Sequence, residues 1–513
     1  MVLSANKSVV YNKLKGVVGA ANVTDKDIIL EAYTATGTHA GRTTEEREAS
    51  KKPSFVVNAG STEEIQAIVR LANEYKVPIV PIGAFTGVYR DAVPLEGGIM
   101  LDMKRMKGIE IDEDVMTVTI EPGVTWAHAY RELAAKGYWI SNQALPAAIS
   151  IMGTTTQAGP HLPDDKHAVP NSSYYSTLTM GLEVVLPTGE LLVTGSAALP
   201  GTKPQRPRAY GPDVGALFLG AQGTLGIVVK QTLPLWRIPE VRHTVTGIFK
   251  DENFKGLSTA MHRIVSSNFA GGPIWIEKVW SVYKSHGEGQ VFRQPWKRPG
   301  EWELYVQVYG LKDRVEFDKE FVEKMITDEG GKVAAPGESE WPDIEITFSP
   351  GPPYEEAIFW RPRVNSIVLP PPLSLDQCRA GGFFPIPHDQ IPELHDALLN
   401  VLADHGIPKT RLNQGSLGAS LRGQSLSFTY YYDYNDADEV KRAEAINKEA
   451  NAMITKLGTS MGAPFVYYRP TPINARKLMP QLGEYYELLK KLKRMLDPNR
   501  IMNPGHLMDL EPY

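Results

Sequence analysis

The sequence has a single cysteine, Cys378, and no apolar run long enough to cross a membrane. One cysteine excludes an intrachain disulfide and any metal site built from several cysteines, and it is typical of a reducing compartment. The first 18 residues carry Lys7, Lys13 and Lys15 among their apolar positions, so they resemble neither a signal peptide nor a membrane span. We therefore expect a cytoplasmic location.

Positive charge is not in excess either. Lys and Arg total 54 against 59 Asp and Glu, which gives a net charge of -5. Binding to a phosphate backbone requires a basic surface, so nucleic acid is not an expected partner. With 513 residues, 42% of them apolar, the chain is long enough for two or three domains with sizeable cores.

Three familiar motifs are also missing. The sequence contains no G-x-G-x-x-G, no G-x-x-x-x-G-K-[S/T] and no H-E-x-x-H. Dinucleotide-fold dehydrogenases, P-loop NTPases and zincins therefore lose support.

The hydrophobic periodicity predicts a mixture of helices and strands. Ser61 and Glu64 match a capping box at the start of a helix, and short branched runs at 77–82 and 99–103 predict strands. Alternating patterns predict two hairpins, at 109–120 and 182–193, with a helix between them over 126–136. The hydrophobic pattern changes near residue 240. From there, three helical segments (254–265, 315–326 and 391–405) alternate with strand-like runs, as expected for a second α+β domain.

The most informative features are four glycine-rich turns of low charge. They span 81–87, 121–125, 153–159 and 220–227. Consecutive backbone amides in such turns can bind a diphosphate without a lysine, because they form a concave nest of N–H donors. Taken singly, each turn is more often an ordinary turn than a phosphate site.

The order of these turns, followed by L-D-P-N-R-I-M-N-P-G at 496–505, resembles the vanillyl-alcohol oxidase and p-cresol methylhydroxylase superfamily of FAD-dependent oxidoreductases. The pattern is closest to the 4-phenol-oxidising branch. The resemblance implies an α+β fold, in which a two-part FAD-binding domain is interrupted by an inserted α+β cap domain over the flavin ring. We predict the first part of the FAD domain at 1–240, the cap at 241–455 and the C-terminal return at 456–513.

The same resemblance assigns residues to the cofactor. On the pyrophosphate it places Pro81, Ile82, Gly83, Ala84, Phe85, Thr86 and Gly87. Along the diphosphate and flavin it places Gly153, Thr154, Gln157 and Gly159. Near the adenine it places Gly223, Gly226 and Ile227, and near the flavin ring Asn503.

Three residues resemble the substrate-binding groups of the phenol oxidases. Tyr468 and Arg469 match a Tyr-Arg pair that stabilises the substrate phenolate, and Tyr89 resembles a second tyrosine that faces it. An arginine and tyrosine hydroxyls around an anionic oxygen make the ring electron-rich, so hydride leaves more readily to flavin N5. Arg469 would serve equally well to hold a carboxylate, which hydroxy-acid-oxidising relatives require.

The sequence departs from the phenol branch near the expected base. Gln157 stands where that branch commonly has an aspartate, and a glutamine side chain cannot act as a base. His161, His167 and His39 are candidate replacements, and we include His161 among the predicted catalytic residues.

Two further departures concern the cofactor and a metal. Gln424 and Ser425 lie where several phenol oxidases carry a flavin-linking histidine, so we expect non-covalent FAD, with a tyrosyl link through Tyr430, Tyr431 or Tyr432 as a minor alternative. The metal-binding E-H-G motif of the lactate and glycolate dehydrogenase branch is absent, so no metal site is expected.

The leading hypothesis is an FAD-dependent oxidase or dehydrogenase. It takes hydride from a para-substituted phenol or aromatic alcohol and is reoxidised by oxygen or another acceptor. A 2-hydroxy-acid dehydrogenase is the alternative of the same class, and a non-catalytic flavin-binding protein is the alternative of another class. The expected partners are a small-molecule substrate, an electron-accepting protein and a second copy of the chain in a homodimer.

Overall fold

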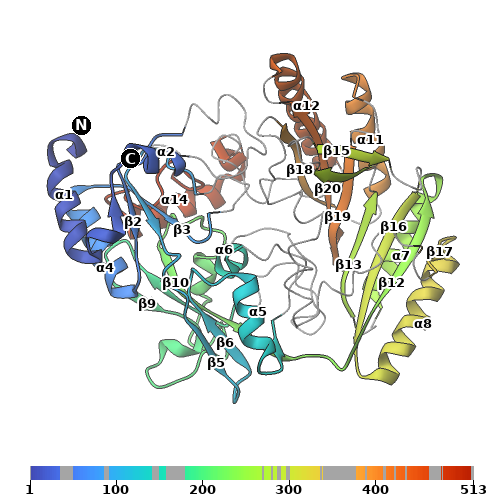
Figure 1. Ribbon diagram of the computed structural model, residues 1–513, viewed down its shortest axis with the longest axis horizontal. Coiled ribbons are helices and arrows are strands. Elements are labelled where there is room, and N and C mark those ends of the chain that lie inside the picture. Colours follow the sequence, from blue (N-terminus) through green and yellow to red (C-terminus); the bar gives the residue numbers. More distant parts are fainter. Residues whose placement is uncertain are drawn as a thin grey trace.

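The computed structural model describes residues 2–34, 50–85, 92–140, 149–156, 179–267, 271–278, 281–285, 291–295, 301–335, 338, 377–386, 390–407, 412–420, 423–433, 436–460, 475–476 and 478–509. They form two lobes of mixed helix and strand, and both chain termini lie in the same lobe (Figure 1). This arrangement confirms the predicted α+β class.

The first lobe is built on two sheets. One has four strands in the order β1-β2-β4-β3, in which β2 and β3 both run parallel to β4. Its strands are β1 (Val23–Thr24), β2 (Phe55–Asn58), β3 (Ile79–Ile82) and β4 (Ile99–Asp102). The other is antiparallel, in the order β5-β6-β10-β8-β9. Its strands are β5 (Ile109–Asp112), β6 (Thr117–Ile120), β8 (Gly181–Val185), β9 (Leu191–Val193) and β10 (Ile227–Pro234).

The predicted elements of this lobe are confirmed with small shifts of their ends. Ser61 accepts a hydrogen bond from the backbone of Glu64, and the Glu64 carboxylate accepts one from Gly60, so the helix starts where the capping pattern predicts. Gly137 and Gly189 have positive φ, which ends one predicted helix and closes one predicted hairpin. The helices of the lobe are α1 (Val2–Val18), α2 (Asp27–Ala32), α4 (Thr62–Tyr75), α5 (Trp126–Ala134), α6 (Ile151–Thr155) and α14 (Glu484–Leu496).

The C-terminal return completes the first lobe. Ile79 of β3 forms a parallel bridge with Met502, and Ile501 and Met502 are buried in the same apolar cluster as β2, β4 and α4. Residues more than 400 positions apart in the sequence therefore share one core.

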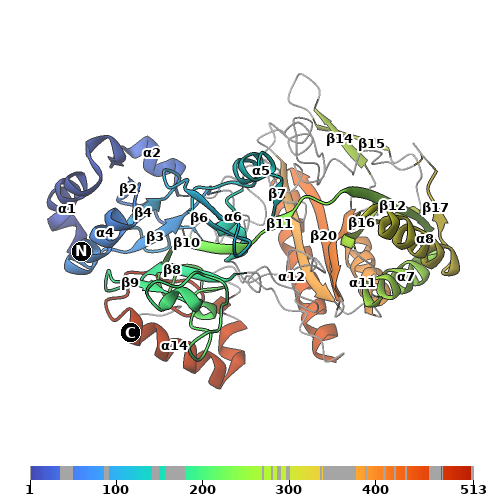
Figure 2. The ribbon, with the colours of Figure 1, turned by 90° about the horizontal axis from the view of Figure 1, so that it is seen from below.

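The second lobe is a seven-stranded sheet in the order β17-β12-β16-β13-β19-β20-β18. Its strands are β12 (Val241–Lys250), β13 (Gly271–Lys278), β16 (Glu301–Gly310), β17 (Lys332–Val333), β18 (Gln377–Ile386), β19 (Leu412–Ser420) and β20 (Gly423–Asp433). The helices are α7 (Phe254–Ser266), α8 (Lys312–Asp328), α11 (Ile391–Asp404) and α12 (Ala437–Ser460), and Figure 2 shows them on one side of the sheet. A separate hairpin, β14 (Ser281–Ser285) with β15 (Val291–Pro295), lies on the other side (Figure 2).

Alternation along β16 decides which face of this sheet meets its helices. Trp302, Leu304, Val306 and Val308 are fully buried and join residues of α7, α8, α11 and α12 in one core. Tyr309 is on the opposite face, and its ring meets Trp139 of β7 (Tyr138–Trp139) edge to face at 5.5 Å. That face is therefore turned toward the first lobe.

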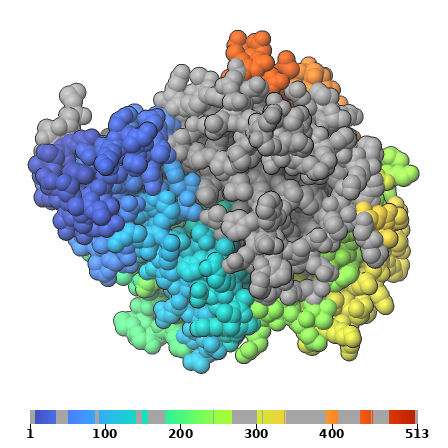
Figure 3. Space-filling model, viewed as in Figure 1, coloured from blue at the N-terminus to red at the C-terminus, as the bar shows by residue number. Residues whose placement is uncertain are grey.

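The two lobes meet where β12 begins. Strand β11 (Trp236–Arg237), which pairs with β7, lies shortly before Val241, the first residue of β12. Figure 3 shows one face of the described surface, with the first lobe in blue, cyan and green on the left and the second lobe in yellow-green, yellow and orange on the right. The exact limits of 1–240, 241–455 and 456–513 stay a prediction.

Candidate flavin-binding site

Three segments predicted to bind FAD meet in the first lobe, and we call them the glycine cradle: Pro81–Phe85, Gly220–Ile227 and Asn503. Gly223 has φ +70, and a Cβ on it would lie 2.8 Å from Cγ of Pro81. Any other residue would push the two loops apart, so glycine is required by close approach as well as by its backbone conformation.

Asn503 joins the cradle through both its backbone and its side chain. Its backbone N–H donates to Ile79 O at 2.9 Å, and its Nδ2 donates to Gln222 O at 2.7 Å. The residue predicted near the flavin ring is thus bonded to the turn predicted near the adenine.

A fourth segment lies beside the cradle, but as a helix and not as the turn that the sequence indicated. Ser150 caps α6 by accepting from the backbone of Gly153, and its hydroxyl donates to Pro122 O at 2.7 Å. A Cβ on Gly83 would lie 3.0 Å from the Ser150 hydroxyl, so α6 packs closely on the Pro81–Phe85 loop. The Thr154 hydroxyl donates to Ile151 O inside the helix, so this hydroxyl and the Gly153 N–H both have partners within residues 150–154.

Two residues predicted to bind the cofactor, Gly226 and Ile227, are packed against the protein interior. A Cβ on Gly226 would lie 2.9 Å from a methyl group of Val184, so this glycine lets the turn approach β8. Ile227 is 1% exposed and belongs to the apolar core. Only the backbone of Ile227 is available to a cofactor.

The ring of Phe85 stacks on the ring of Tyr33, the residue that caps the C-terminus of α2. The rings of Phe85 and Tyr33 stack at 5.4 Å, and the Tyr33 hydroxyl donates to Oδ2 of Asp102 at 2.7 Å. Asp102 is 1% exposed, and Lys104 Nζ lies 2.9 Å from the same carboxylate oxygen. Burial and the hydrogen bond to Asp102 raise the pKa of Tyr33 above its ordinary value, so the phenol remains a donor at neutral pH.

Three residues of the cradle have a left-handed backbone conformation. Phe85, Gln222 and Asn503 have φ of 58, 53 and 39, the left-handed region that residues with a side chain rarely adopt. Each such residue costs on the order of 1–3 kcal/mol, and residues of this kind cluster at ligand sites.

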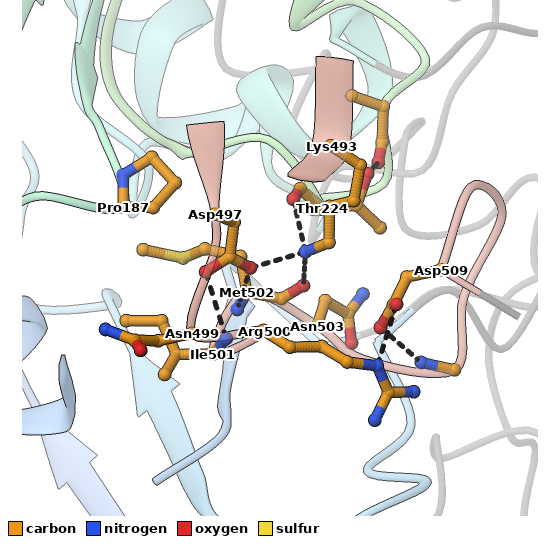
Figure 4. A network of polar contacts seen from close by, with 12 residues as sticks. Pro187, Thr224, Lys493, Asp497, Asn499, Arg500, Ile501, Met502, Asn503 and Asp509 are labelled. Atoms are coloured by element: carbon orange, nitrogen blue, oxygen red, sulfur yellow. Dashed lines mark hydrogen bonds and ion pairs between the residues drawn. The ribbon is translucent and has the colours of Figure 1, made fainter. Parts of the chain in front are cut away.

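A buried lysine ties the cradle to the C-terminal return (Figure 4). Lys493 of α14 has no exposed surface, and its Nζ donates to Thr224 O at 2.8 Å, to Met502 O at 2.8 Å and to Asp497 Oδ2 at 2.5 Å. Burial lowers the pKa of Lys493, and the adjacent Asp497 carboxylate opposes that effect. Asp497 in turn accepts from the backbone N–H groups of Ile501 and Met502.

Three residues of this site were missed by sequence reasoning. Lys493 and Asp497 are spaced i,i+4 in K-R-M-L-D, a pattern that the sequence could have revealed but that is common on exposed helices. Gln222 lies inside G-A-Q-G, and no local pattern distinguishes it from an ordinary turn residue.

The remaining predicted site residues lie outside the described part of the chain. They are Thr86, Gly87, Tyr89, Gln157, Gly159, His161, Tyr468 and Arg469. Within the described part, no cluster of three or more His, Cys, Asp or Glu side chains could hold a metal ion. None of the helices described is long and apolar enough to span a membrane.

The described residues fit FAD. The cradle offers backbone groups from glycine-rich turns. The buried ion pair of Lys493 with Asp497 holds these turns in place. The buried side-chain oxygen of Gln222 has no hydrogen-bond partner among the described residues. Such a site suits a large cofactor that binds through backbone contacts and a few polar groups.

Comparison with known proteins agrees with this geometry. Residues 53–195 match the family of the FAD binding domain, and residues 468–507 match the C-terminal domain of FAD linked oxidases. A probable mitochondrial D-lactate dehydrogenase from Danio rerio is 25% identical over 473 residues, covering 90% of this chain and 85% of the relative. The flavoprotein subunit of 4-cresol dehydrogenase [hydroxylating] from Pseudomonas putida is 26% identical over 496 residues, covering 89% and 88%.

A solved structure shows the same fold. The crystal structure of p-cresol methylhydroxylase with substrate bound superposes with a TM-score of 0.78 at 22% identity, covering 99% of this chain and 98% of that one. The protein is an FAD-linked oxidoreductase, with FAD as its cofactor. The two family matches and the cresol dehydrogenase relative confirm the resemblance to the vanillyl-alcohol oxidase and p-cresol methylhydroxylase superfamily.

Replacing the buried lysine should loosen the cradle. Lys493→Met removes one member of a fully buried ion pair and leaves Asp497 charged, which typically costs about 3–5 kcal/mol. We expect a lower thermal midpoint and weaker FAD retention after gel filtration. Lys324→Met is the matched control, because Lys324 and Asp328 have the same i,i+4 spacing on the exposed face of α8, where a pair contributes little. Equal stability losses in the two variants would contradict this role for Lys493.

The Tyr33 phenol should contribute a pH-dependent part of stability. Its pKa is raised in the folded state, so its stabilising effect is complete below the unfolded pKa of about 10 and is lost as the pH rises further. Wild-type protein should therefore lose stability above about pH 10, and Tyr33→Phe should lose less over the same range. The measurement is urea unfolding at several alkaline pH values, and identical slopes for both proteins would refute the assignment.

Proposed function

We propose that this protein oxidises a para-substituted phenol or aromatic alcohol with non-covalently bound FAD. The observation that carries the flavin part is the contact of Gly223 with Pro81, because it joins two loops and Asn503 into one cradle of backbone groups. The substrate part is supported by the Tyr468–Arg469 pattern in the sequence. It is also supported by the 4-cresol dehydrogenase relative, which matches this chain along 88% of its own length.

In this proposal the cradle and α6 hold the cofactor. Backbone groups of Pro81–Phe85, with Thr86 and Gly87, bind the pyrophosphate, and those of Gly153 and Thr154, with Gln157 and Gly159, continue along it. The turn with Gly223, Gly226 and Ile227 and the nearby Asn503 complete the site. FAD, when bound, supplies the acceptor for a hydride equivalent from the substrate carbon.

The substrate would be fixed by Arg469, Tyr468 and Tyr89. The guanidinium and the two hydroxyls would hold an anionic phenolate oxygen and favour its ionised form, since donors around an oxyanion stabilise its charge. His161 and Gln157 are the proposed polar groups on the other side of the reacting carbon. The cytoplasmic location, the homodimer and an electron-accepting protein partner are retained as predictions.

A 2-hydroxy-acid dehydrogenase is the second candidate. Arg469 would then hold the substrate carboxylate. It is supported by the D-lactate dehydrogenase relative, which is as similar in identity and coverage as the cresol enzyme.

The cofactor should leave the polypeptide when the protein unfolds. Because Gln424 and Ser425 replace the flavin-linking histidine, we expect the purified protein to be yellow and to release all of its FAD into the supernatant on acid or heat denaturation. Absorbance of the pellet and of the supernatant measures this. Flavin that remains with the precipitated chain would show a covalent link.

Substrate class is tested by anaerobic mixing with a panel of para-alkyl phenols, aromatic alcohols and 2-hydroxy acids while flavin absorbance is followed. We expect phenols to bleach the flavin. Tyr468→Phe should slow this reduction by about 100-fold and shift its pH profile upward, because one donor to the phenolate is lost. Tyr467→Phe is the control, since it removes the adjacent hydroxyl.

The 2-hydroxy-acid hypothesis predicts a different pH dependence for the Tyr468→Phe variant. A carboxylate is already ionised at neutral pH, so Tyr468→Phe would leave the pH profile unchanged. Reduction by a hydroxy acid and by no phenol, with that unchanged profile, would replace the phenol proposal with the second candidate.

A further inference from the structure

One feature of Gln222 has no structural explanation within the described chain. Its side-chain Oε1 is buried and has no hydrogen-bond partner among the described residues. A buried amide without a partner loses hydration and gains nothing in return, so such groups are rare unless a ligand supplies the missing bond.

The surroundings of Gln222 locate that ligand. The next residue, Gly223, packs on Pro81, and the carbonyl of Gln222 itself accepts from Nδ2 of Asn503. Gln222 is therefore inside the glycine cradle, where all three of its segments meet. The hydrogen bond to Asn503 uses the backbone oxygen and leaves the side-chain amide available.

We propose that Gln222 is a cofactor-binding residue, whose side-chain amide oxygen accepts a hydrogen bond from an N–H or O–H group of the flavin nucleotide. This inference rests on the proposed position of FAD in the cradle. Donors of this kind occur on both halves of FAD, as the adenine amino group and ribose hydroxyls or as the ribityl hydroxyls and the ring N–H. The bond makes Gln222 a side-chain determinant of cofactor affinity in a site otherwise built from backbone groups.

The test is Gln222→Met, which keeps the length of the side chain and the backbone bond to Asn503 but removes the acceptor. Loss of one neutral hydrogen bond should raise the Kd for FAD by about 5- to 30-fold and speed FAD release from the diluted holoenzyme by a similar factor. Flavin fluorescence follows both. Binding of ADP and of FMN to the FAD-depleted protein assigns the donor, because only the probe that carries it should bind the variant more weakly than the wild type.

Stability without FAD separates this role from a structural one. Because Oε1 of Gln222 bonds to no described residue, its replacement by methionine removes no described hydrogen bond of that oxygen, so the thermal midpoint of the FAD-free variant should equal or exceed that of the wild type. Gln390→Met is the matched control: Gln390, at the N-cap of α11 in the second lobe, also has a buried Oε1 without a described partner. This change should leave FAD affinity unaltered.

Three results would overturn the proposal. They are an unchanged FAD Kd and release rate in Gln222→Met, a fall in the midpoint of the FAD-free variant, and an equal loss of FAD affinity in Gln390→Met. If the FAD-free protein aggregates, the release rates of the two holoenzyme variants decide alone. Failure of the proposed function would look different, because no phenol would then bleach the flavin of the wild-type protein, while the FAD Kd of Gln222→Met would still be raised.

Discussion

The buried ammonium group of Lys493 is the interaction on which the flavin-binding lobe depends. It reaches from α14 to the backbone oxygens of Thr224 and Met502 and to the Asp497 carboxylate, so it joins the Gly220–Ile227 turn to the C-terminal return. A charge with no exposed surface is tolerable only because all three of its donors are used and a carboxylate neutralises it. The same return supplies Asn503 and the bridge to β3.

This constraint explains how a site can be assembled from segments so distant in the sequence. Met502 and Ile79 are backbone partners, and the strand that contains Ile79 leads directly into Pro81–Phe85. The Gly220–Ile227 turn packs closely on Pro81 at Gly223. Because each contact fixes backbone and not side chains, the cradle presents oriented N–H and C=O groups, with strain stored at Phe85, Gln222 and Asn503.

The two faces of the seven-stranded sheet in the second lobe have different neighbours. Its described helices α7, α8, α11 and α12 cover one face of the seven-stranded sheet and share one apolar core with it. The opposite face is turned toward the flavin lobe, as the contact of Tyr309 with Trp139 shows.

The sequence by itself determined the elements and the cofactor class. Local patterns were sufficient for α4, for both hairpins and for the strands around the glycine turns, because capping, alternation and positive-φ glycines act within a few residues. The order of the turns was sufficient for FAD. Only the tertiary structure decided that residues 151–155 form a helix, that Ile227 is a core residue, and that Lys493 and Gln222 belong to the site. Those properties depend on burial and on contacts between segments far apart in the chain, and no local pattern of residue types records which groups lose their water when the chain folds.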